Sequence, residues 1–171
     1  MDELGARAFA AARAMVGAPF RPQGYDPATG LDCVGLVWTA YAAAGKRLVR
    51  PVGYPLRGWS RAQVEAGLFA AGFEPVGTDM RDGDVALIAL DAGQFHLGLM
   101  GADRMVHAHA GLRKVVETPI DDDLRDVVRW RLLSCPPRCD QPASWQVSWS
   151  EPRVSDHPLP HAGGEKISGA Y

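Results

Sequence analysis

Apolar positions recur with a helical period in the first half of the chain and in short, nearly continuous runs in the second half. Residues 2–16 are rich in alanine and predict a first helix. In residues 33–44 apolar side chains occupy more than one helical face, so we expect a second helix that is buried on most sides and ends at Gly45. A third, shorter helix is expected over residues 60–71, with Ser60 as its N-cap.

Strand-like patterns follow in the second half. The apolar run at residues 85–90 predicts a buried strand. Residues 18–31, which contain several prolines and glycines, are expected to form a loop. Helices followed by strands are typical of an α+β fold in which a helical half packs on an antiparallel sheet. The other strands are expected at residues 96–100, 104–109, 113–117 and 126–133, with a turn near residues 101–103.

The composition predicts one folded domain followed by a tail. Of the 171 residues, 47% are apolar, which is enough for a substantial core. Prolines are concentrated late in the chain, so residues 1–135 are interpreted as the domain and residues 136–171 as a mostly extended or disordered tail. Within the tail, residues 143–149 alternate between apolar and polar with the period of a strand. This piece either docks on the domain or a partner, or belongs to a loose tail.

Charge and hydropathy exclude several classes of partner. The net charge is −2 and the pI is about 6.2, so the chain lacks the basic character of a nucleic-acid-binding protein. No apolar stretch approaches the roughly 20 residues that a membrane-spanning helix needs. The acidic first residues and the arginines at positions 7 and 13 are unlike a secretory signal, so we expect the protein to be made and first folded in the cytoplasm.

Cys33 is a candidate nucleophile in the first turn of the predicted second helix. The preceding residue, Asp32, is a suitable N-cap. Free N–H groups and the helix dipole at that end stabilise an anion, so we expect the pKa of the thiol to be lowered and its nucleophilicity raised. The same N–H groups could stabilise a tetrahedral oxyanion. The alternative is that Cys33 is a small buried apolar residue.

Three histidines of the domain, His96, His107 and His109, are candidate bases for this thiol. If the turn between their strands has two or four residues, all three side chains lie on one face of the sheet, whereas a three-residue turn separates them. A cysteine at a helix start beside two such histidines can supply a nucleophile, a base and a group that orients the base. Alternatively, each histidine is a solvent-facing strand residue.

The chemistry-bearing segments occur in a specific order and spacing. They are Val16-Gly17-Ala18-Pro19-Phe20-Arg21 with Leu31-Asp32-Cys33-Val34-Gly35-Leu36-Val37, then Arg81-Asp82-Gly83-Asp84-Val85, then Phe95-His96-Leu97-Gly98-Leu99 with Met105-Val106-His107-Ala108. Together they resemble the NlpC/P60 cysteine peptidases, which have a papain-like core and cleave peptides of bacterial cell walls. The resemblance covers about residues 6–133. The sequence at residues 21–24 is a variant of the family's sequence, and it is most similar to that of a small, signal-less branch associated with phages and gene-transfer particles.

The resemblance implies a role for each of these polar residues. Cys33 is the expected nucleophile, His96 the general base and His107 the group that orients His96. His109 matches no position of the family and is the second choice for the orienting role.

The resemblance also implies that Asp32, Phe20 and Val34 contact the substrate. The family usually has Tyr where Phe20 stands and Ser where Val34 stands, so this chain lacks two hydroxyl groups near the thiol. We expect thiol chemistry to be retained and recognition of the peptide's amino end to differ.

The implied function is that of a cysteine endopeptidase that hydrolyses amide bonds in peptidoglycan stem peptides without a metal or cofactor. The implied partners are peptidoglycan peptides and, for the phage-like branch, tail components, with delivery to the wall by lysis or within a particle. Three alternatives stay open. They are a related thiol amidase or acyltransferase, a non-catalytic structural module of a phage-like tail hub, and a metal site built from Cys33 and the three histidines.

The remaining motifs are weaker. Cys135 and Cys139 are interpreted as surface thiols, because no second pair completes a zinc site. His157 and His161 are separated by prolines, which exclude a helix that would align them. The loop at residues 54–59 either borders the cleft or packs as an ordinary loop.

Overall fold

Helices precede and flank one antiparallel sheet in the computed structural model, which describes residues 3–51, 53–54, 60–77, 79–90, 94–125 and 127–133. The helices are α1 (Glu3–Ala14), α2 (Cys33–Ala43), α3 (Arg61–Ala70) and α4 (Asp122–Arg125). The strands are β1 (Tyr25–Asp26), β2 (Gly30–Leu31), β3 (Phe73–Val76), β4 (Val85–Leu90), β5 (Gln94–Met100), β6 (Arg104–His109), β7 (Lys114–Pro119) and β8 (Val128–Leu132).

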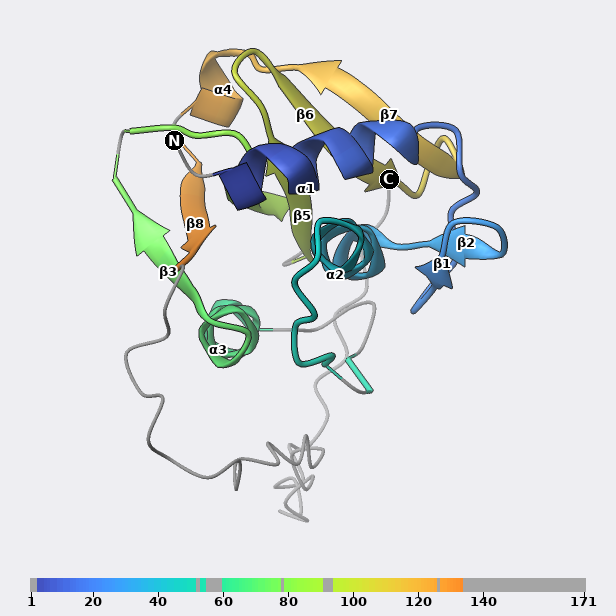
Figure 1. Ribbon diagram of the computed structural model, residues 1–171, viewed down its shortest axis with the longest axis horizontal. Coiled ribbons are helices and arrows are strands. Elements are labelled where there is room, and N and C mark those ends of the chain that lie inside the picture. Colours follow the sequence, from blue (N-terminus) through green and yellow to red (C-terminus); the bar gives the residue numbers. More distant parts are fainter. Residues whose placement is uncertain are drawn as a thin grey trace, which may run out of the picture.

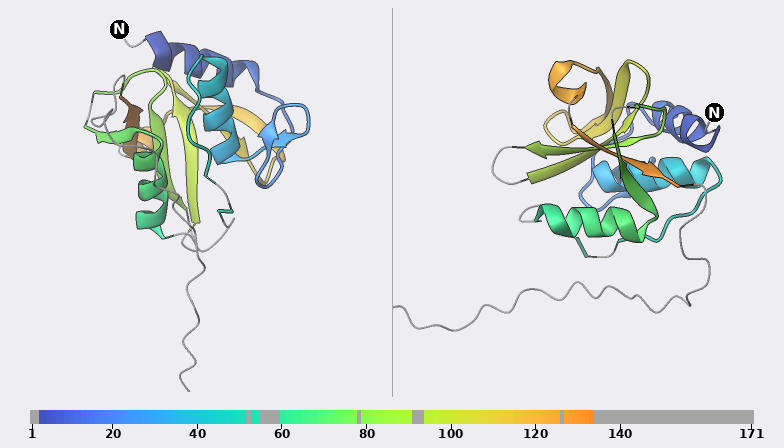
Figure 2. Two further views of the ribbon diagram at one scale, coloured as in Figure 1. Left: turned by 60° about the horizontal axis from the view of Figure 1, so that its bottom comes forward. Right: turned by 90° about the vertical axis from the view of Figure 1, so that its left-hand side faces the viewer.

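The main sheet has the strand order β3-β8-β4-β5-β6-β7, and all its neighbouring strands are antiparallel. Helices α1 and α2 pack against each other and against β5 and β6, whereas α3 packs on the edge strand β3 (Figure 1, Figure 2). Strands β1 and β2 form a separate ladder between α1 and α2. The predicted α+β fold, with helices packed on an antiparallel sheet, is confirmed.

Helix α2 lies at the centre of the core, as its apolar sequence predicts. Residues on all of its sides are buried, including Leu36 and Val37, which have no exposed surface. Burial of each large apolar side chain contributes about 1.5–3 kcal/mol. Gly45 adopts a φ of 97° just after the helix, a conformation that favours glycine. The helix therefore presents its first residue, Cys33, on a rigid element.

Several short elements were missing from the sequence prediction. Strand β3, helix α4 and the β1–β2 ladder within the predicted loop at residues 18–31 each contain too few positions to show a period. The expectation that the run at residues 85–90 is buried throughout is also wrong. Its first three residues are buried, but Leu90 is 46% exposed because the end of β4 extends beyond the core.

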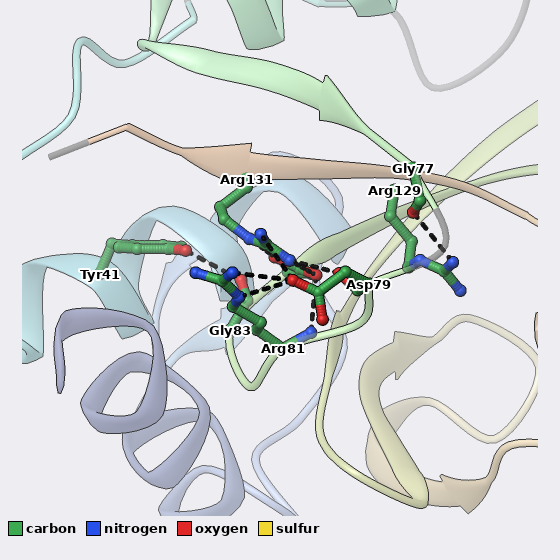
Figure 3. A network of polar contacts seen from close by, with 8 residues as sticks. Tyr41, Gly77, Asp79, Arg81, Gly83, Arg129 and Arg131 are labelled. Atoms are coloured by element: carbon green, nitrogen blue, oxygen red, sulfur yellow. Dashed lines mark hydrogen bonds and ion pairs between the residues drawn. The ribbon is translucent and has the colours of Figure 1, made fainter. Parts of the chain in front are cut away.

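A charged network joins the loop before β4 to strand β8. The guanidinium of Arg131 donates to both carboxylate oxygens of Asp84, at 2.7 and 2.8 Å, and Asp84 is 1% exposed. The backbone N–H of Arg81 donates to the same carboxylate. On the other side of the loop, the hydroxyl of Tyr41 in α2 donates to the carbonyl oxygen of Gly83 at 2.8 Å (Figure 3). The network thus fixes α2 and two strands to one loop.

Candidate active site

The start of α2 is fixed by its N-cap and by a closely packed loop. Asp32 is the N-cap, and its Oδ1 accepts a hydrogen bond from the N–H of Gly35 at 2.7 Å, as the sequence predicts. A Cβ at position 35 would collide with the carbonyl oxygen of Gly24, so glycine allows the loop to pack directly on the helix. Cys33, the first residue of α2, is partly exposed.

His96 on β5 and His107 on β6 meet across the hairpin that joins these strands. Met100 pairs with Met105, so four residues separate the paired positions and the two histidines lie on one face of the sheet. The Nε2 of His96 and the Nδ1 of His107 are 2.8 Å apart, and the rings meet edge to face. A Cβ at Gly98 would collide with the side chain of Met105, so glycine keeps the two strands close at this point.

His107, and not His109, contacts His96. The ring of His109 lies 5.6 Å from that of His107 and borders the same cleft. Its Nδ1 accepts a hydrogen bond from the N–H of Leu112 at 3.1 Å in the turn after β6. The geometry therefore favours the first choice for the orienting residue.

The hydrogen bond between His96 and His107 restricts their tautomers. Because Nε2 of His96 faces His107, only its Nδ1 is left to accept a proton from a thiol. In that state the His96 Nε2–H donates to Nδ1 of His107, which then carries its own hydrogen on Nε2. This Nε2 is buried and has no hydrogen-bond partner among the described residues.

A cleft of about 360 Å³ brings the predicted site residues together. Cys33, His96 and His107 all border it. The backbone N–H of Leu97, directly after His96, is one of the groups that lower the pKa of the Cys33 thiol, so β5 lies beside the sulfur at the helix start. The three predicted substrate-binding residues also line the cleft: Phe20, Asp32 and Val34.

The thiol of Cys33 is less acidic than the sequence predicts. Burial, and to a smaller extent the negative charge of Asp32, raise its pKa to about 11. The backbone N–H groups of Leu97, Val34 and Cys33 lower it, but by less. The expected lowering of the pKa is therefore wrong, because the loss of solvation outweighs the N–H groups at the helix start.

Both histidines of the pair are neutral at pH 7. Burial lowers the pKa of His96 to about 3, with smaller contributions from His107 and His109. Burial also lowers the pKa of His107 to about 4, and His109 adds to this shift. The site thus holds a neutral thiol beside neutral imidazoles, so attack by this sulfur on a substrate would require transfer of the thiol proton.

Asp32 is held by three neutral donors. Besides Gly35, the N–H of Gln23 and the hydroxyl of Tyr54 donate to its carboxylate, each at 2.7 Å. Asp32 is 2% exposed, and burial raises its pKa. Tyr54 is buried, lines the cleft, and its carbonyl oxygen accepts a hydrogen bond from Nε2 of Gln23. The sequence left the role of Tyr54 open, because a contact between residues 22 positions apart has no local signal.

The solved structures to which the chain is similar in fold are NlpC/P60 domains. No family model and no curated protein sequence matches the chain. NlpC2 from Trichomonas vaginalis superposes with a TM-score of 0.58 at 18% identity, covering 77% of this chain and 46% of that one. The chain has the NlpC/P60 fold. RipB, a peptidoglycan hydrolase from Mycobacterium tuberculosis, superposes with a TM-score of 0.53 at 20% identity, covering 77% of this chain and 66% of that one.

Fold and catalysis are separable among NlpC/P60 structures. RipD from Mycobacterium tuberculosis, a non-catalytic NlpC/P60 domain protein adapted to peptidoglycan binding, matches with a TM-score of 0.50 at 22% identity, covering 78% of this chain and 100% of that one. The chain spans less than half the length of the Trichomonas protein. At these identities the likeness establishes the NlpC/P60 fold, and the chemistry has to be argued from the residues in the cleft.

The other sequence motifs add no second site to the described part of the chain. Within the described ranges, no three His, Cys, Asp or Glu side chains are grouped so that they could bind one metal ion, so the alternative of a metal site at Cys33 and the histidines lacks geometric support. No described helix has the length and apolar character needed to cross a membrane. The following lie outside the described residues: Cys135, Cys139, residues 143–149, His157 and His161.

Proposed function

We propose that the protein is a cysteine-dependent peptidoglycan hydrolase, an endopeptidase that cleaves amide bonds in stem peptides. The observation that carries this proposal is the cleft in which Cys33 lies with His96 and His107, whose facing nitrogens are 2.8 Å apart. The NlpC/P60 fold supports the choice of substrate, because RipB, which shares the fold, is a peptidoglycan hydrolase.

The reaction proceeds through an acyl-enzyme. Sγ of Cys33 attacks the amide carbonyl carbon while its proton passes to Nδ1 of His96. Backbone N–H groups at the start of α2 stabilise the oxyanion. His96 then returns the proton to the amide nitrogen, the C–N bond breaks, and the amine leaves. Water, deprotonated by His96, hydrolyses the thioester and restores the thiol.

His107 acts on this reaction by orienting His96. Its Nδ1 accepts the hydrogen bond from Nε2 of His96, which fixes the tautomer with a free lone pair at Nδ1. When His96 becomes an imidazolium, the same hydrogen bond is charge-assisted and stronger. We therefore expect removal of His107 to lower kcat by about 10²–10⁴-fold.

The decisive experiment is digestion of purified peptidoglycan, with the products identified by mass spectrometry. Wild-type protein should release peptides with new amino and carboxyl ends, whereas Cys33→Ala should release none. His107→Ala should be strongly impaired and His109→Ala should keep most of the activity, because only His107 contacts His96. Cleavage by Cys33→Ala, or no cleavage by folded wild-type protein, would overturn the proposal.

A peptidoglycan-binding module without catalysis is the second candidate. It is favoured by the likeness to RipD and by the high pKa of the Cys33 thiol. Sedimentation with peptidoglycan that is equal for wild type and Cys33→Ala, without any released peptide, would support it. A related amidase or acyltransferase would be recognised by its products. An acyltransferase needs an acceptor amine and leaves no free acid.

The route to the substrate is a separate proposal. We retain synthesis in the cytoplasm, with delivery to the wall by lysis or within a phage-like particle, as a prediction. Co-purification of the protein with particles or its appearance in the medium only after lysis would test it.

A further inference from the structure

A second hollow of the molecule lies between the loop that follows α2, the end of α3 and the strands β3 and β8. It has a volume of about 340 Å³ and is bordered by residues 46–49, 69–74 and 132–133, and we call it the α3 groove. No described residue lines both this groove and the cleft at Cys33. Two of its large apolar side chains, Val49 and Phe69, are 74% and 54% exposed. Apolar side chains that are exposed together in a hollow are typical of an interaction surface.

Both walls of the α3 groove are held in place by the core. On one side, the carbonyl oxygen of Val49 accepts a hydrogen bond from Nε1 of Trp38 in α2 at 2.8 Å. On the other side, the ring of Phe69 meets the buried ring of Trp130 edge to face, with ring centroids 4.8 Å apart. A ligand that enters a preformed groove has to order few protein groups, so less of its binding energy is lost.

The chain leaves the described part of the fold at this groove. Leu132 and Leu133, the last two described residues, border it, and the N–H of Leu133 donates to the carbonyl oxygen of Gly72 at 3.3 Å. Residues 134–142 separate Leu133 from residues 143–149, whose apolar and polar positions alternate. A linker of this length can bridge a gap of up to about 30 Å. The segment at residues 143–149 is therefore within reach of the α3 groove.

The tether favours this segment over a separate molecule as the occupant. A segment joined to its site by a short linker has an effective concentration in the millimolar range. A second copy of the chain, in a solution of micromolar concentration, competes at far lower concentration. The groove therefore meets its own chain first.

The side chains of the segment suit the walls of the α3 groove. In an extended segment Trp145, Val147 and Trp149 lie on one side, because alternate side chains point the same way. Indole rings bury a large apolar area and favour edge-to-face contact with another aromatic ring, as Trp130 already has with Phe69. The exposed part of the Phe69 ring offers a second contact of this kind.

Charge at the border of the groove agrees with the same occupant. Lys46 and Arg47 lie at the border, together with one described acidic residue, Glu74. Glu151 follows the segment two positions after Trp149. Ion pairs at an exposed border add little affinity, but they favour one direction of a bound segment over the other.

We propose that residues 143–149 bind in the α3 groove of the same chain, with an indole ring of Trp145 or Trp149 against Phe69. The groove is then an internal docking site that fixes the part of the chain after the sheet. The proposal uses no residue of the cleft at Cys33, so it stands apart from the proposed hydrolase activity.

The test uses the full chain labelled with 5-fluorotryptophan and observed by ¹⁹F nuclear magnetic resonance. The resonances of Trp145 and Trp149 are assigned by their loss in Trp145→Phe and Trp149→Phe. A synthetic peptide of residues 140–153 with the same label gives the positions for the free segment. We expect at least one of the two resonances in the full chain to differ from its position in the peptide.

Two charge variants at exposed apolar residues locate the binding site. Val49→Glu places a carboxylate in the groove, where docking would bury it, and should lower the ratio of docked to free segment by about tenfold. Leu112→Glu adds the same charge at a residue that is 57% exposed and borders neither the groove nor the cleft, and it should leave both resonances unchanged. Because both side chains are largely exposed, both variants should fold.

Each other outcome contradicts the proposal. Resonances of Trp145 and Trp149 that coincide with those of the peptide would show that the segment is not bound. Resonances that differ from the peptide but respond equally to both charge variants would place the segment elsewhere. A difference that disappears on dilution would identify a second copy of the chain as the occupant. Cys33→Ala should leave the resonances unchanged, so the result is independent of whether the protein cleaves peptidoglycan.

Discussion

Two buried aspartates lie near opposite ends of α2, and the protein compensates them differently. Near the amino end, the three donors to Asp32 are all neutral. Near the other end, Tyr41 reaches the loop in which Asp84 is paired with the guanidinium of Arg131 (Figure 3). The ion pair cancels the charge of Asp84, whereas the charge of Asp32 persists and raises the pKa of the neighbouring thiol. Asp84 thus stabilises the fold near one end of α2, whereas Asp32 changes the pKa of the thiol at the other end.

The largest effect on stability is expected at the ion pair. Arg131→Met would leave Asp84, which is 1% exposed, without its cation. Removing one partner of a buried pair leaves an uncompensated charge, so we expect the free energy of unfolding to fall by about 3 kcal/mol. Urea denaturation followed by circular dichroism measures this value.

An exposed ion pair provides the matched control. Arg61 and Glu65 lie four residues apart on α3 with their charged groups 2.8 Å apart, but the arginine side chain is 52% exposed. Arg61→Met should therefore cost no more than about 0.5 kcal/mol. Equal losses for the two variants would show that the pair at Asp84 has no special role.

The histidine pair, which borders the cleft with Cys33 at the amino end of α2, should make the protein sensitive to acid. The pKa values of His96 and His107, about 3 and about 4 when folded, lie below the usual value of 6.5. Between these values the unfolded chain binds more protons than the folded one, so stability is complete above pH 6.5 and falls as the pH drops towards 4. Each histidine contributes at most about 1.4 kcal/mol per pH unit.

Urea midpoints measured from pH 7 to pH 4 test this sensitivity. His107→Asn removes one of the two groups and also one of the influences that lower the pKa of His96, so its stability should fall less steeply with acid. A variant that falls as steeply as the wild type would contradict the assignment of the acid sensitivity to this pair.

Two tyrosine hydroxyls donate comparable hydrogen bonds, one to a charged acceptor and one to a neutral acceptor. Tyr54 donates to the carboxylate of Asp32, and Tyr41 donates to the carbonyl oxygen of Gly83. Both side chains are almost fully buried. Hydrogen bonds to charged groups are stronger, so Tyr54→Phe should cost about 2 kcal/mol and Tyr41→Phe about 1 kcal/mol. Chemical denaturation of both variants gives the comparison, and a larger loss for Tyr41→Phe would contradict it.

The sequence predicts those parts of the molecule that depend on local pattern. The apolar faces of α2 and the N-cap at Asp32 follow from spacing along one element. The face shared by His96 and His107 was left open by the sequence, because it depends on the length of the turn between β5 and β6, which the pairing of Met100 with Met105 decides. The prediction that Cys33 lies at a helix start also correctly placed backbone N–H groups near its thiol.

Properties set by distant contacts were not predictable in this way. The pKa of the thiol depends on how completely β5 and α2 cover the sulfur, and burial proved to be the larger effect. The hydrogen bond from Tyr54 to Asp32 joins residues 22 positions apart. Likewise, Arg131 meets Asp84 across 47 positions, and no local period marks either residue.

The smallest and most specific effect should follow from neutralising Asp32. Asp32→Asn keeps a side-chain oxygen that can cap α2 through Gly35, but it removes the charge that raises the pKa of Cys33. The thiol pKa should fall, so alkylation of Cys33 by iodoacetamide at pH 8–9 should be faster than in the wild type.

The matched control for this charge is Asp84→Asn, measured where both variants keep the wild-type circular dichroism spectrum. The contact of Asp84's loop with α2 is at Tyr41, eight residues or about 12 Å along the helix from Cys33, so the thiol titration should not change. If both substitutions shifted the titration alike, the effect would reflect a loosened fold. If Asp32→Asn left the thiol titration unchanged, the charge of Asp32 would have no influence on the sulfur. The two aspartates would then differ only in their hydrogen-bonding partners.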